Sequence, residues 1–407
     1  MSEERREFSP MSLSELNEVL GLTVKEDNLN KVITFLCCLS AYTENSQFNI
    51  SFNAPSSSGK SYIPLEVASY FPKEDVKEIG YCTAQAFYHD AELIDKEKGI
   101  FAVDFERKIV IFIDQPYPDV LHRLRPILSH DKKIIEAKIT DKSQKHGLKT
   151  KNIFVKGFAS VIFCSAGLKV DEQEGTRFIL LSPETTQEKI RKGVLEALKK
   201  ESNPTAHCKE LAENVDRRNL IERIRAIKEA KITEIRIHDI ALIARWFIDE
   251  QRIPKPRHQR DAKRVCSIIK SHALLNLWNR EMLEPGVILT DDEDIEVGLK
   301  LWEEIAECQE LNLPPYIYKI YCEVIMPAYE RDKILTIQKI QQEYYKVYGR
   351  TIDDWKLRRE IIPMLCTAGK IRLEQNPADK RNNLIIPVLS TPDSIISDES
   401  NIDTGVE

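Results

Sequence analysis

The residues best suited to chemistry are a glycine, a lysine and a serine in direct succession, Gly59-Lys60-Ser61. They close a stretch that begins at Asn49 as a short apolar strand, continues as a loop of small residues and opens a helix. In such an arrangement consecutive backbone N–H groups and the positive end of the helix face an anion. The lysine can reach the β- and γ-phosphates of a nucleoside triphosphate, and the serine hydroxyl can ligate Mg²⁺. The predicted phosphate loop comprises Ala54, Pro55, Ser56, Ser57, Ser58, Gly59, Lys60 and Ser61.

The loop departs from the usual pattern G-x-x-x-x-G-K-[ST] at its first position, where Ala54 replaces glycine. Alanine still lets the backbone approach a ligand closely, but it narrows the choice of φ and ψ. The alternative is a polar turn that contains Gly-Lys-Ser by chance. The strand and helix patterns on either side, which a phosphate loop requires, argue against that alternative.

A second feature is the apolar run from Lys108 to Gln115, which ends in Asp114. Continuous apolar runs of this length are typical of central strands in a parallel sheet, covered on both faces. Ligands of α/β proteins bind at the carboxyl ends of such strands. Asp114 is therefore predicted to hold Mg²⁺, directly or through water, together with Ser61. The alternative is an aspartate that caps the next element.

Composition places the chain among soluble, globular proteins. It has 407 residues, enough for two or three domains, with a net charge of −6, 42% hydrophobic and 30% charged residues. No run of about 18 apolar residues suggests a membrane span, and the polar N-terminus lacks the apolar stretch of a signal peptide. The nine cysteines are scattered without a Cys-x-x-Cys. This cysteine pattern predicts a reducing, cytoplasmic location and no zinc site. The lack of an apolar span predicts no membrane partner.

The charge is unevenly distributed. The segment 122–156 holds ten lysines and arginines against three acidic residues, whereas the tail 390–407 holds five acidic and no basic residues. Within the basic segment, alternating apolar residues bracket a polar tip, which predicts a β-hairpin over 134–156. Its tip could contact DNA phosphates; the bland alternative is a solvated charged loop. The candidate DNA-binding residues are Lys142, Lys145, His146 and Lys149.

Periodicity suggests five successive regions. The last folded one reads as three helices followed by a two-stranded wing, the outline of a winged helix. The acidic tail has the composition of a disordered segment. The expected regions are an N-terminal arm (1–30), an α/β nucleotide-binding core (31–205), a helical lid (206–313), a winged helix (314–389) and the tail (390–407).

This order of parts resembles the AAA+ ATPases that carry a β-hairpin just before the sensor-1 strand. Within that branch the chain is most similar to minichromosome-maintenance-type and superfamily 3 replicative helicases, including those of mobile elements and viruses. The resemblance spans about residues 30–390. It implies an α/β fold with a P-loop AAA+ parallel-sheet core, a helical lid and a C-terminal winged helix. It also implies ATP and Mg²⁺ as cofactors, DNA as partner and a ring of identical subunits, commonly a hexamer.

The resemblance gives roles to individual residues. Lys60 and Ser61 match the Walker A pair, and Asp114 matches the Walker B acid. Ser165 stands at the sensor-1 position, which helps to place the attacking water; a plain strand-ending serine is the alternative.

Two arginines match positions that act on the nucleotide in the family. Arg177, in Thr176-Arg177-Phe178, resembles the arginine that reaches the γ-phosphate bound to the neighbouring subunit. The alternative is a surface arginine paired with a nearby glutamate. Arg260 aligns with the sensor-2 arginine, with Arg257 and Arg264 as rivals within reach of the same helix end.

One residue breaks the pattern. The family places a glutamate after the Walker B aspartate to polarise the hydrolytic water, whereas this chain has Gln115. Glutamine can orient a water by hydrogen bonding, as in P-loop GTPases, but cannot accept its proton. Another carboxylate would then act as base, with Asp119 and Glu136 nearby in sequence, or hydrolysis is slow.

The sequence therefore predicts an ATP-driven DNA helicase or translocase. The resemblance alone implies a role in replicating a mobile or viral element. A second hypothesis is an ATP-dependent switch or loader that binds DNA without unwinding it, which Gln115 favours. A third is a regulatory ATPase whose partner is a protein.

Overall fold

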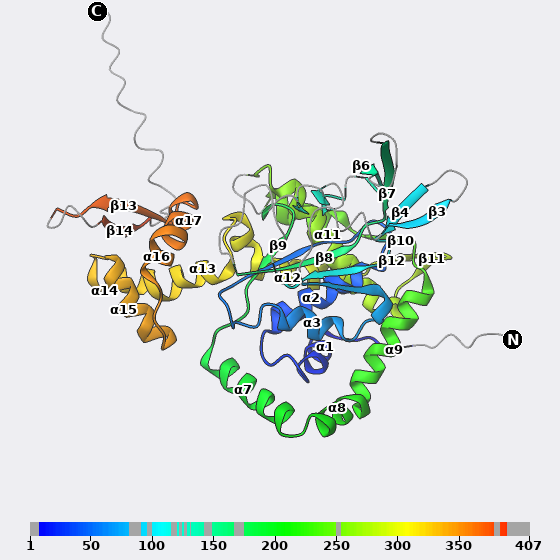
Figure 1. Cartoon of the computed structure of the whole chain (residues 1–407), viewed down its shortest axis with the longest axis horizontal. Helices are drawn as coiled ribbons and strands as arrows, with labels where there is room; N and C mark the ends of the chain where they lie inside the picture. Colours follow the sequence, from blue (N-terminus) through cyan, green and yellow to red (C-terminus); the bar gives the residue numbers. More distant parts are fainter. Residues whose placement is uncertain are drawn as a thin grey trace, which may run out of the picture. The chain divides into compact units, whose positions relative to one another are not determined.

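The computed structural model of the chain forms two compact units, Met1–Tyr316 and Ile317–Glu407 (Figure 1). The residues that the structure describes are 8–80, 91–95, 100–114, 120–121, 124–125, 128–130, 132–141, 149–166, 175–249, 254–377 and 383–388. Within these ranges, no helix is long and apolar enough to cross a membrane.

The first unit is built around a parallel sheet of five strands, which run in the order β2-β5-β8-β1-β9. All neighbouring strands in it are parallel. The predicted α/β class with a parallel-sheet core is confirmed at this level. The strands are β1 (Ile50–Asn53), β2 (Val76–Ile79), β5 (Ile109–Phe112), β8 (Ser160–Ser165) and β9 (Ile179–Leu181).

Both faces of this sheet are covered, as the continuous apolar run at Lys108–Gln115 predicts. In β5, Ile109 and Ile111 belong to one apolar cluster, while Val110 and Phe112 belong to another. In β8, the side chains alternate between the same two clusters. The sheet is therefore a rigid layer with apolar packing on each side.

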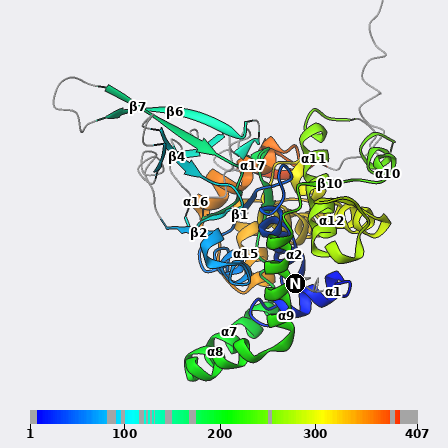
Figure 2. The same ribbon diagram turned by 90° about the vertical axis from the view of Figure 1, so that its right-hand side faces the viewer.

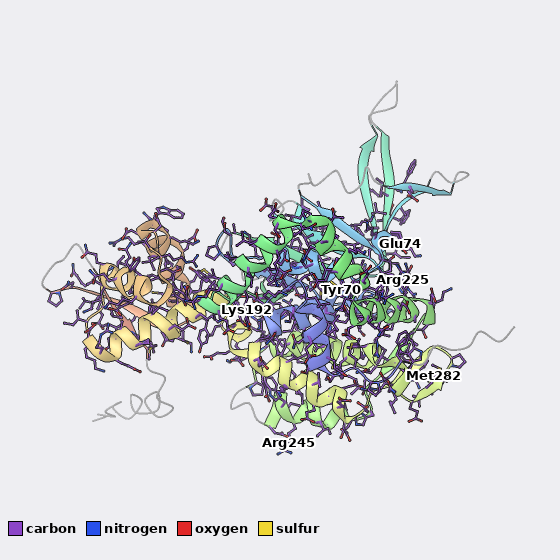
Figure 3. The ribbon with its side chains drawn as sticks, turned by 90° about the horizontal axis from the view of Figure 1, so that it is seen from below. Tyr70, Glu74, Lys192, Arg225, Arg245 and Met282 are labelled. Carbon is purple, nitrogen blue, oxygen red and sulfur yellow. The ribbon has the colours of Figure 1, made fainter. Side chains whose placement is uncertain are left out.

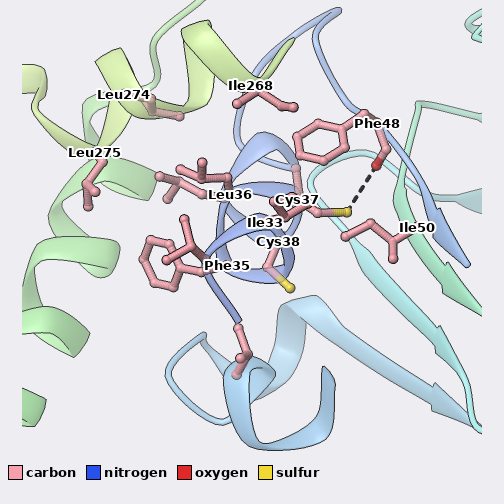
Figure 4. Close-up of a cluster of buried hydrophobic side chains, with 14 of the residues drawn as sticks. Ile33, Phe35, Leu36, Cys37, Cys38, Phe48, Ile50, Ile268, Leu274 and Leu275 are labelled. Carbon is pink, nitrogen blue, oxygen red and sulfur yellow. Dashed lines mark hydrogen bonds between the residues drawn. The ribbon is translucent and has the colours of Figure 1, made fainter. Parts of the chain in front are cut away.

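Helix α2 (Asn28–Ser40) is the centre of the larger cluster, because every residue from Asn30 to Ser40 is buried. It packs against the sheet and against α11 (His258–Leu275). Figure 4 shows Phe35 and Leu36 of α2 among Ile50, Ile268 and Leu274. The Cys37 thiol donates to the Phe48 carbonyl, with an Sγ–O distance of 3.1 Å. Burial raises the pKa of Cys37 and Cys38 well above the usual range, so both thiols are apolar packing groups.

Part of the stretch expected to be an N-terminal arm packs into this cluster. Helix α1 (Leu13–Leu20) begins with Ser12, whose hydroxyl accepts from the Glu15 N–H at 3.2 Å, while the Glu15 carboxylate accepts from the Ser12 N–H at 2.7 Å. Leu16 and Leu20 are fully buried. The capping box thus fixes a helix whose apolar side belongs to the first unit.

A second sheet continues from the first. It has the order β3-β4-β7-β6, with β3 (Glu92–Asp95), β4 (Ile100–Asp104), β6 (Ile134–Asp141) and β7 (Lys149–Lys156). Strands β6 and β7 pair antiparallel in the stretch expected to be a hairpin, and they project from the main sheet (Figure 2). Strand β7 also pairs in parallel with β4, which the sequence analysis did not predict.

Two short connections join the sheets. Phe105–Lys108 leads from β4 to β5, and Gly157–Ala159 leads from β7 to β8. The first connection is bonded at both ends to the neighbouring strands, because the Phe105 N–H donates to the Lys156 carbonyl of β7 at 2.8 Å and the Ser160 N–H of β8 donates to the Lys108 carbonyl at 3.0 Å. The strand pair β4/β7 therefore runs into the strand pair β5/β8 without a free linker.

Gly157 is required at this junction, and we expect Gly157→Ala to destabilise the first unit by about 2 kcal/mol or more. Its φ is +85°, and a Cβ there would lie 2.4 Å from the Glu106 backbone nitrogen. Gly286→Ala is the matched control, since its φ is +83° but the nearest atom is the Thr233 hydroxyl oxygen at 3.2 Å. Chemical denaturation measures both. Equal losses would show that the backbone contact at Gly157 is unimportant.

The stretch after β9 is mostly helical but not entirely. The helices are α7 (Gln187–Ser202), α8 (Pro204–Glu213), α9 (Val215–Ala230), α10 (Ile240–Ala244) with a π-helical turn at Arg245–Asp249, α11 and α12 (Asp292–Glu310). A three-stranded sheet of order β10-β12-β11 lies among them, formed by β10 (Glu234–Arg236), β11 (Met282–Glu284) and β12 (Val287–Leu289). The helical region expected over 206–313 therefore also contains strands, which the sequence did not reveal because strands of three residues are too short to show alternation.

A buried charged cluster ties α11 to α12. The Asp294 carboxylate accepts from Arg280 Nε at 2.7 Å and lies 2.6 Å from His272 Nδ1. The side chains of Asp294 and His272 are fully buried, and that of Arg280 is 3% exposed. Asp294 also closes the capping box of α12 with Asp291. The cluster therefore fixes the start of α12 as well as its partner helix.

The second unit has its own small core, which includes Ile340, Leu357 and Ile385. Its strands pair antiparallel, with Ile371 opposite Pro387. Helical segments followed by a two-stranded hairpin stand in the order that the sequence predicts. The elements are α13 (Pro315–Ile320), α14 (Met326–Asp332), α15 (Ile337–Tyr348), α16 (Asp354–Lys356), α17 (Ile362–Thr367), β13 (Ile371–Gln375) and β14 (Asn383–Pro387), with π-helical turns at Tyr321–Ile325 and Leu357–Ile361. The first unit also has a 3₁₀ turn at Lys73–Asp75.

Candidate functional site

The loop between β1 and α3 (Tyr62–Ala68) is curled, as a phosphate loop must be. Ser57 and Gly59 both have positive φ, +62° and +90°. Successive backbone N–H groups in such conformations form a concave site for an anion. Ser58 steadies the curl by donating from its hydroxyl to the Pro55 carbonyl at 2.8 Å. The backbone of the loop is therefore curled in a way that could present N–H groups to an anion.

Alanine fits the first loop position without strain. Ala54 is 1% exposed and does not adopt a positive φ. Its N–H donates to the Ser165 carbonyl at 3.2 Å, which ties the loop to the end of β8. Ala54 therefore has a backbone conformation that alanine adopts as readily as glycine.

The sheet order brings the predicted nucleotide residues together. Strand β8 lies between β1 and β5, so the carboxyl ends of these three strands are adjacent. Ser165 is buried and stands opposite Asn53 in the register. Burial raises the pKa of the neighbouring Cys164 thiol to about 12, while the Lys60 charge lowers it and the Asp114 charge raises it. One thiol thus feels both charged groups, at the edge where Ser165 ends β8.

The donor set at this edge fits Mg²⁺ and phosphate. Asp114 is exposed, and Lys60 and Ser61 are partly exposed, so all three can meet a ligand from solvent. A carboxylate and a hydroxyl are hard oxygen ligands of the kind Mg²⁺ takes alongside substrate phosphates. Among the described residues, no group of three or more His, Cys, Asp or Glu could hold a metal by itself.

Several predicted site residues lie outside the described ranges. These are Gln115, Asp119, Lys142, Lys145 and His146; Lys149 begins β7, but its side chain is not among those described. Glu136, the other candidate base, is exposed on β6. That strand belongs to the sheet that feeds the amino end of β8, so Glu136 is not at the carboxyl edge with Asp114.

The structure places Arg177 at the opposite edge of the sheet. It precedes β9, whereas the phosphate loop follows the parallel strand β1. Its Nε donates to the Ser129 hydroxyl at 3.0 Å. A three-residue strand spans about 10 Å. Arg177 and the phosphate loop of the same chain therefore lie at opposite ends of the parallel strands β9 and β1.

Arg260 lies beside Arg177, because its guanidinium contacts the Thr176 hydroxyl. Of the three rival arginines it is the exposed one. Arg257 donates to the buried Asp261 carboxylate at 2.9 Å, and Arg264 donates to the same group at 2.7 Å. Burial lowers the pKa of Arg264 to about 10. These two are structural, which leaves Arg260 as the candidate for binding.

Sequence reasoning missed a charged pair beside the phosphate loop. The Lys189 ammonium, on α7, lies 3.9 Å from where a Cβ would stand on Gly59. It forms an ion pair with Asp27, whose side chain is fully buried. The two residues are far apart in the chain, and each sits in a stretch rich in charge, so no local pattern marks them.

A cavity of about 680 Å³ lies elsewhere, between the end of α3 and α9. Tyr70, Glu74 and Arg225 line it and are labelled in Figure 3. Arg107 lines the cavity as well. Glu74 precedes β2 and Arg107 precedes β5, so the cavity lies at the amino edge of the sheet. It is separate from the phosphate loop.

Neither a protein-family model nor a curated protein matches the chain. Among solved structures, it is similar to the crystal structure of a full-length MCM homolog from Methanopyrus kandleri, with 14% sequence identity and a TM-score of 0.42. The similarity covers 74% of this chain, which spans 63% of the length of that protein.

Proposed function

We propose that the chain is an ATP-dependent DNA helicase or translocase that works as a ring of identical subunits. The observation that carries the proposal is the division of the candidate site between two edges of one sheet. Lys60, Ser61 and Asp114 follow the carboxyl ends of β1 and β5, whereas Arg177 precedes the amino end of β9 and Arg260 contacts the neighbouring Thr176. A complete site would form where the carboxyl edge of one subunit meets the amino edge of the next.

Each side chain then has a distinct task. The loop N–H groups and Lys60 bind the phosphates, and Ser61 with Asp114 would hold Mg²⁺, which neutralises phosphate charge when bound. Ser165 and Gln115 orient the attacking water by hydrogen bonding. Arg177 of the neighbour stabilises the charge that develops on the transferred phosphoryl group. AAA+ architecture, with a lid at 206–313, belongs to this proposal.

DNA contact is assigned to the hairpin β6–β7 with its lysine-rich tip. The winged-helix reading of 314–389 rests on its helices and on the β13–β14 hairpin, but several of its basic residues have partners within the unit. Arg358 donates to Asp354 at 2.7 Å, Arg372 pairs with Glu374 at 3.1 Å, and the Lys370 ammonium lies 5.5 Å from the centre of the Tyr318 ring. This leaves the first-unit hairpin as the main DNA element of the proposal.

A slow ATP-dependent switch is the second candidate, and Gln115 favours it. Glutamine cannot accept a proton, and Glu136 does not lie beside Asp114. In this version ATP binding, rather than turnover, controls DNA binding. A regulatory ATPase with a protein partner is a third, weaker candidate, which a lack of DNA affinity at low salt would favour.

The ATPase rate with and without single-stranded DNA tests the proposal, using the native chain and Gln115→Glu side by side. We expect DNA to stimulate the native chain several-fold, with another group acting as base. A nearly inactive native chain that Gln115→Glu activates would support the switch instead. If both proteins ignore DNA and neither binds ATP, both versions are wrong.

A further inference from the structure

Helix α7 is held to the first unit by charge rather than by apolar packing. None of its residues is buried. Its larger apolar side chains, Ile190, Val194, Leu195 and Leu198, are 48% to 61% exposed. It runs along the outside of the unit (Figures 1 and 2). Three consecutive residues before α2 pair with it: Lys25 with Glu196 at 3.3 Å, Glu26 with Lys192, and Asp27 with Lys189.

The pair nearest the phosphate loop has a special position. The Lys189 ammonium donates to the Glu184 carbonyl at 2.9 Å and contacts Asp27, and these partners hold it beside Gly59. Its side chain is 16% exposed, so it is largely withdrawn from bulk solvent. A cation so close to the residue that precedes Lys60 lies where the proposed nucleotide would bring negative charge.

One carboxylate oxygen of Asp27 has hydrogen-bond partners other than Lys189. Its Oδ1 accepts from the Asn30 side-chain amide at 2.8 Å and from the Glu184 N–H at 2.7 Å. The buried Lys31 also stabilises its charge. The other oxygen, Oδ2, faces Lys189 and has no hydrogen bond of its own, so a bound phosphate would have to share the ammonium with Asp27 instead of drawing it away.

We propose that Lys189 is a second phosphate-binding lysine of the nucleotide site, brought to it by α7 and positioned by Asp27. The inference rests on the proposed nucleotide site at Lys60 and adds a residue from a different element. It also makes α7 respond to occupancy, because the phosphate competes with Asp27 for the same ammonium.

The test measures MgATP affinity by calorimetry for the full chain and three variants. Lys189→Met should weaken MgATP binding by about tenfold or more, the usual value of one charge-assisted hydrogen bond. Lys189→Arg should restore most of the affinity. Lys192→Met is the matched control: it removes the ion pairs with Glu26 and Glu188 from the same helix, one turn further along, and should stay within about twofold of the native chain (Figure 3).

A fourth variant separates the two levels of the proposal. Lys60→Met should lose most MgATP affinity. If it does and Lys189→Met binds like the native chain, only the inference about Lys189 is wrong. Equal losses in Lys189→Met and Lys192→Met would also overturn it, since the lysine would then serve only to attach α7. Native affinity in Lys60→Met would overturn the nucleotide site itself, and this inference with it.

Discussion

Neither Lys60→Ala nor Arg177→Ala protein should hydrolyse ATP alone, yet an equal mixture of the two should regain about a quarter of the native rate. The first variant loses phosphate binding. The second keeps it but loses an arginine of the kind that contributes about 10³–10⁵ in rate when it reaches a neighbour's nucleotide. In a randomly mixed ring, about one interface in four joins an intact phosphate loop to an intact arginine.

The expectation follows from the two edges of the sheet. Arg177 precedes β9 and donates to Ser129, so it cannot complete the site of its own chain without leaving the amino edge. Complementation between inactive subunits is therefore the direct consequence of a site divided between chains.

The control for the mixing experiment is the double variant Lys60→Ala/Arg177→Ala. Mixed with Lys60→Ala, it offers no complete interface and should stay inactive. Mass photometry establishes that all the proteins enter the same assemblies. Full activity of Arg177→Ala alone would contradict a catalytic role for the arginine. No recovery in mixed rings of the native size would contradict the action of Arg177 across the interface.

Asp294→Asn should lower the free energy of unfolding of the first unit by about 3–5 kcal/mol, because it leaves a buried arginine without its main partner. Arg280 donates to Asp294 from both Nε and Nη2, and the arginine side chain is 3% exposed. The substitution also removes the charge that faces His272. Chemical denaturation followed by circular dichroism measures the loss.

The same carboxylate sets a pH dependence. Burial alone would raise the pKa of Asp294, but hydrogen bonds from His272 and Arg280 and from the Asp291 backbone outweigh it and lower the pKa from 3.8 to about 2. The stabilisation is therefore complete above about pH 4 and is lost as the pH falls toward 2. Asp294→Asn should flatten this part of the stability profile.

Asp292→Asn is the matched control on the same helix turn. It removes the same charge near the start of α12, but its carboxylate is 91% exposed and pairs with His238 at 2.8 Å. We expect little change in stability. Similar losses in the two variants would mean that the helix terminus, rather than the buried cluster, is responsible.

The sequence is most informative where one stretch of chain carries its own pattern. The apolar run that ends in Asp114, the loop before Lys60 and the alternation on either side of the hairpin each predict a local structure. Parallel strands then bring Asp114 and Ser165 to one edge, a consequence of topology that requires only the α/β class.

Features that depend on pairing between segments far apart in the chain leave no local pattern in the sequence. Strand β4 is in the second sheet because it pairs with β7, about fifty residues later. The strands β10, β11 and β12 are only three residues long, so they form strands because they pair with one another and not because of their own sequences. Lys189 pairs with Asp27 across 162 residues of the chain. It is one of several lysines in its helix, so no local pattern marks it.

The continuity of the two sheets gives the hairpin a mechanical property. Strands β4 and β7 pass their hydrogen bonding to β5 and β8 across the Phe105–Lys108 and Gly157–Ala159 connections. We therefore expect a twist of the strands that lead to Asp114 and Ser165 to rotate β6 and β7 with them. Each hairpin strand has eight residues, roughly 26 Å at 3.3 Å per residue. A rotation of about 5° at the base of the hairpin would then move the far end of its strands by roughly 2 Å. A small change of angle at the main sheet would thus become a larger displacement at the far end of β6 and β7.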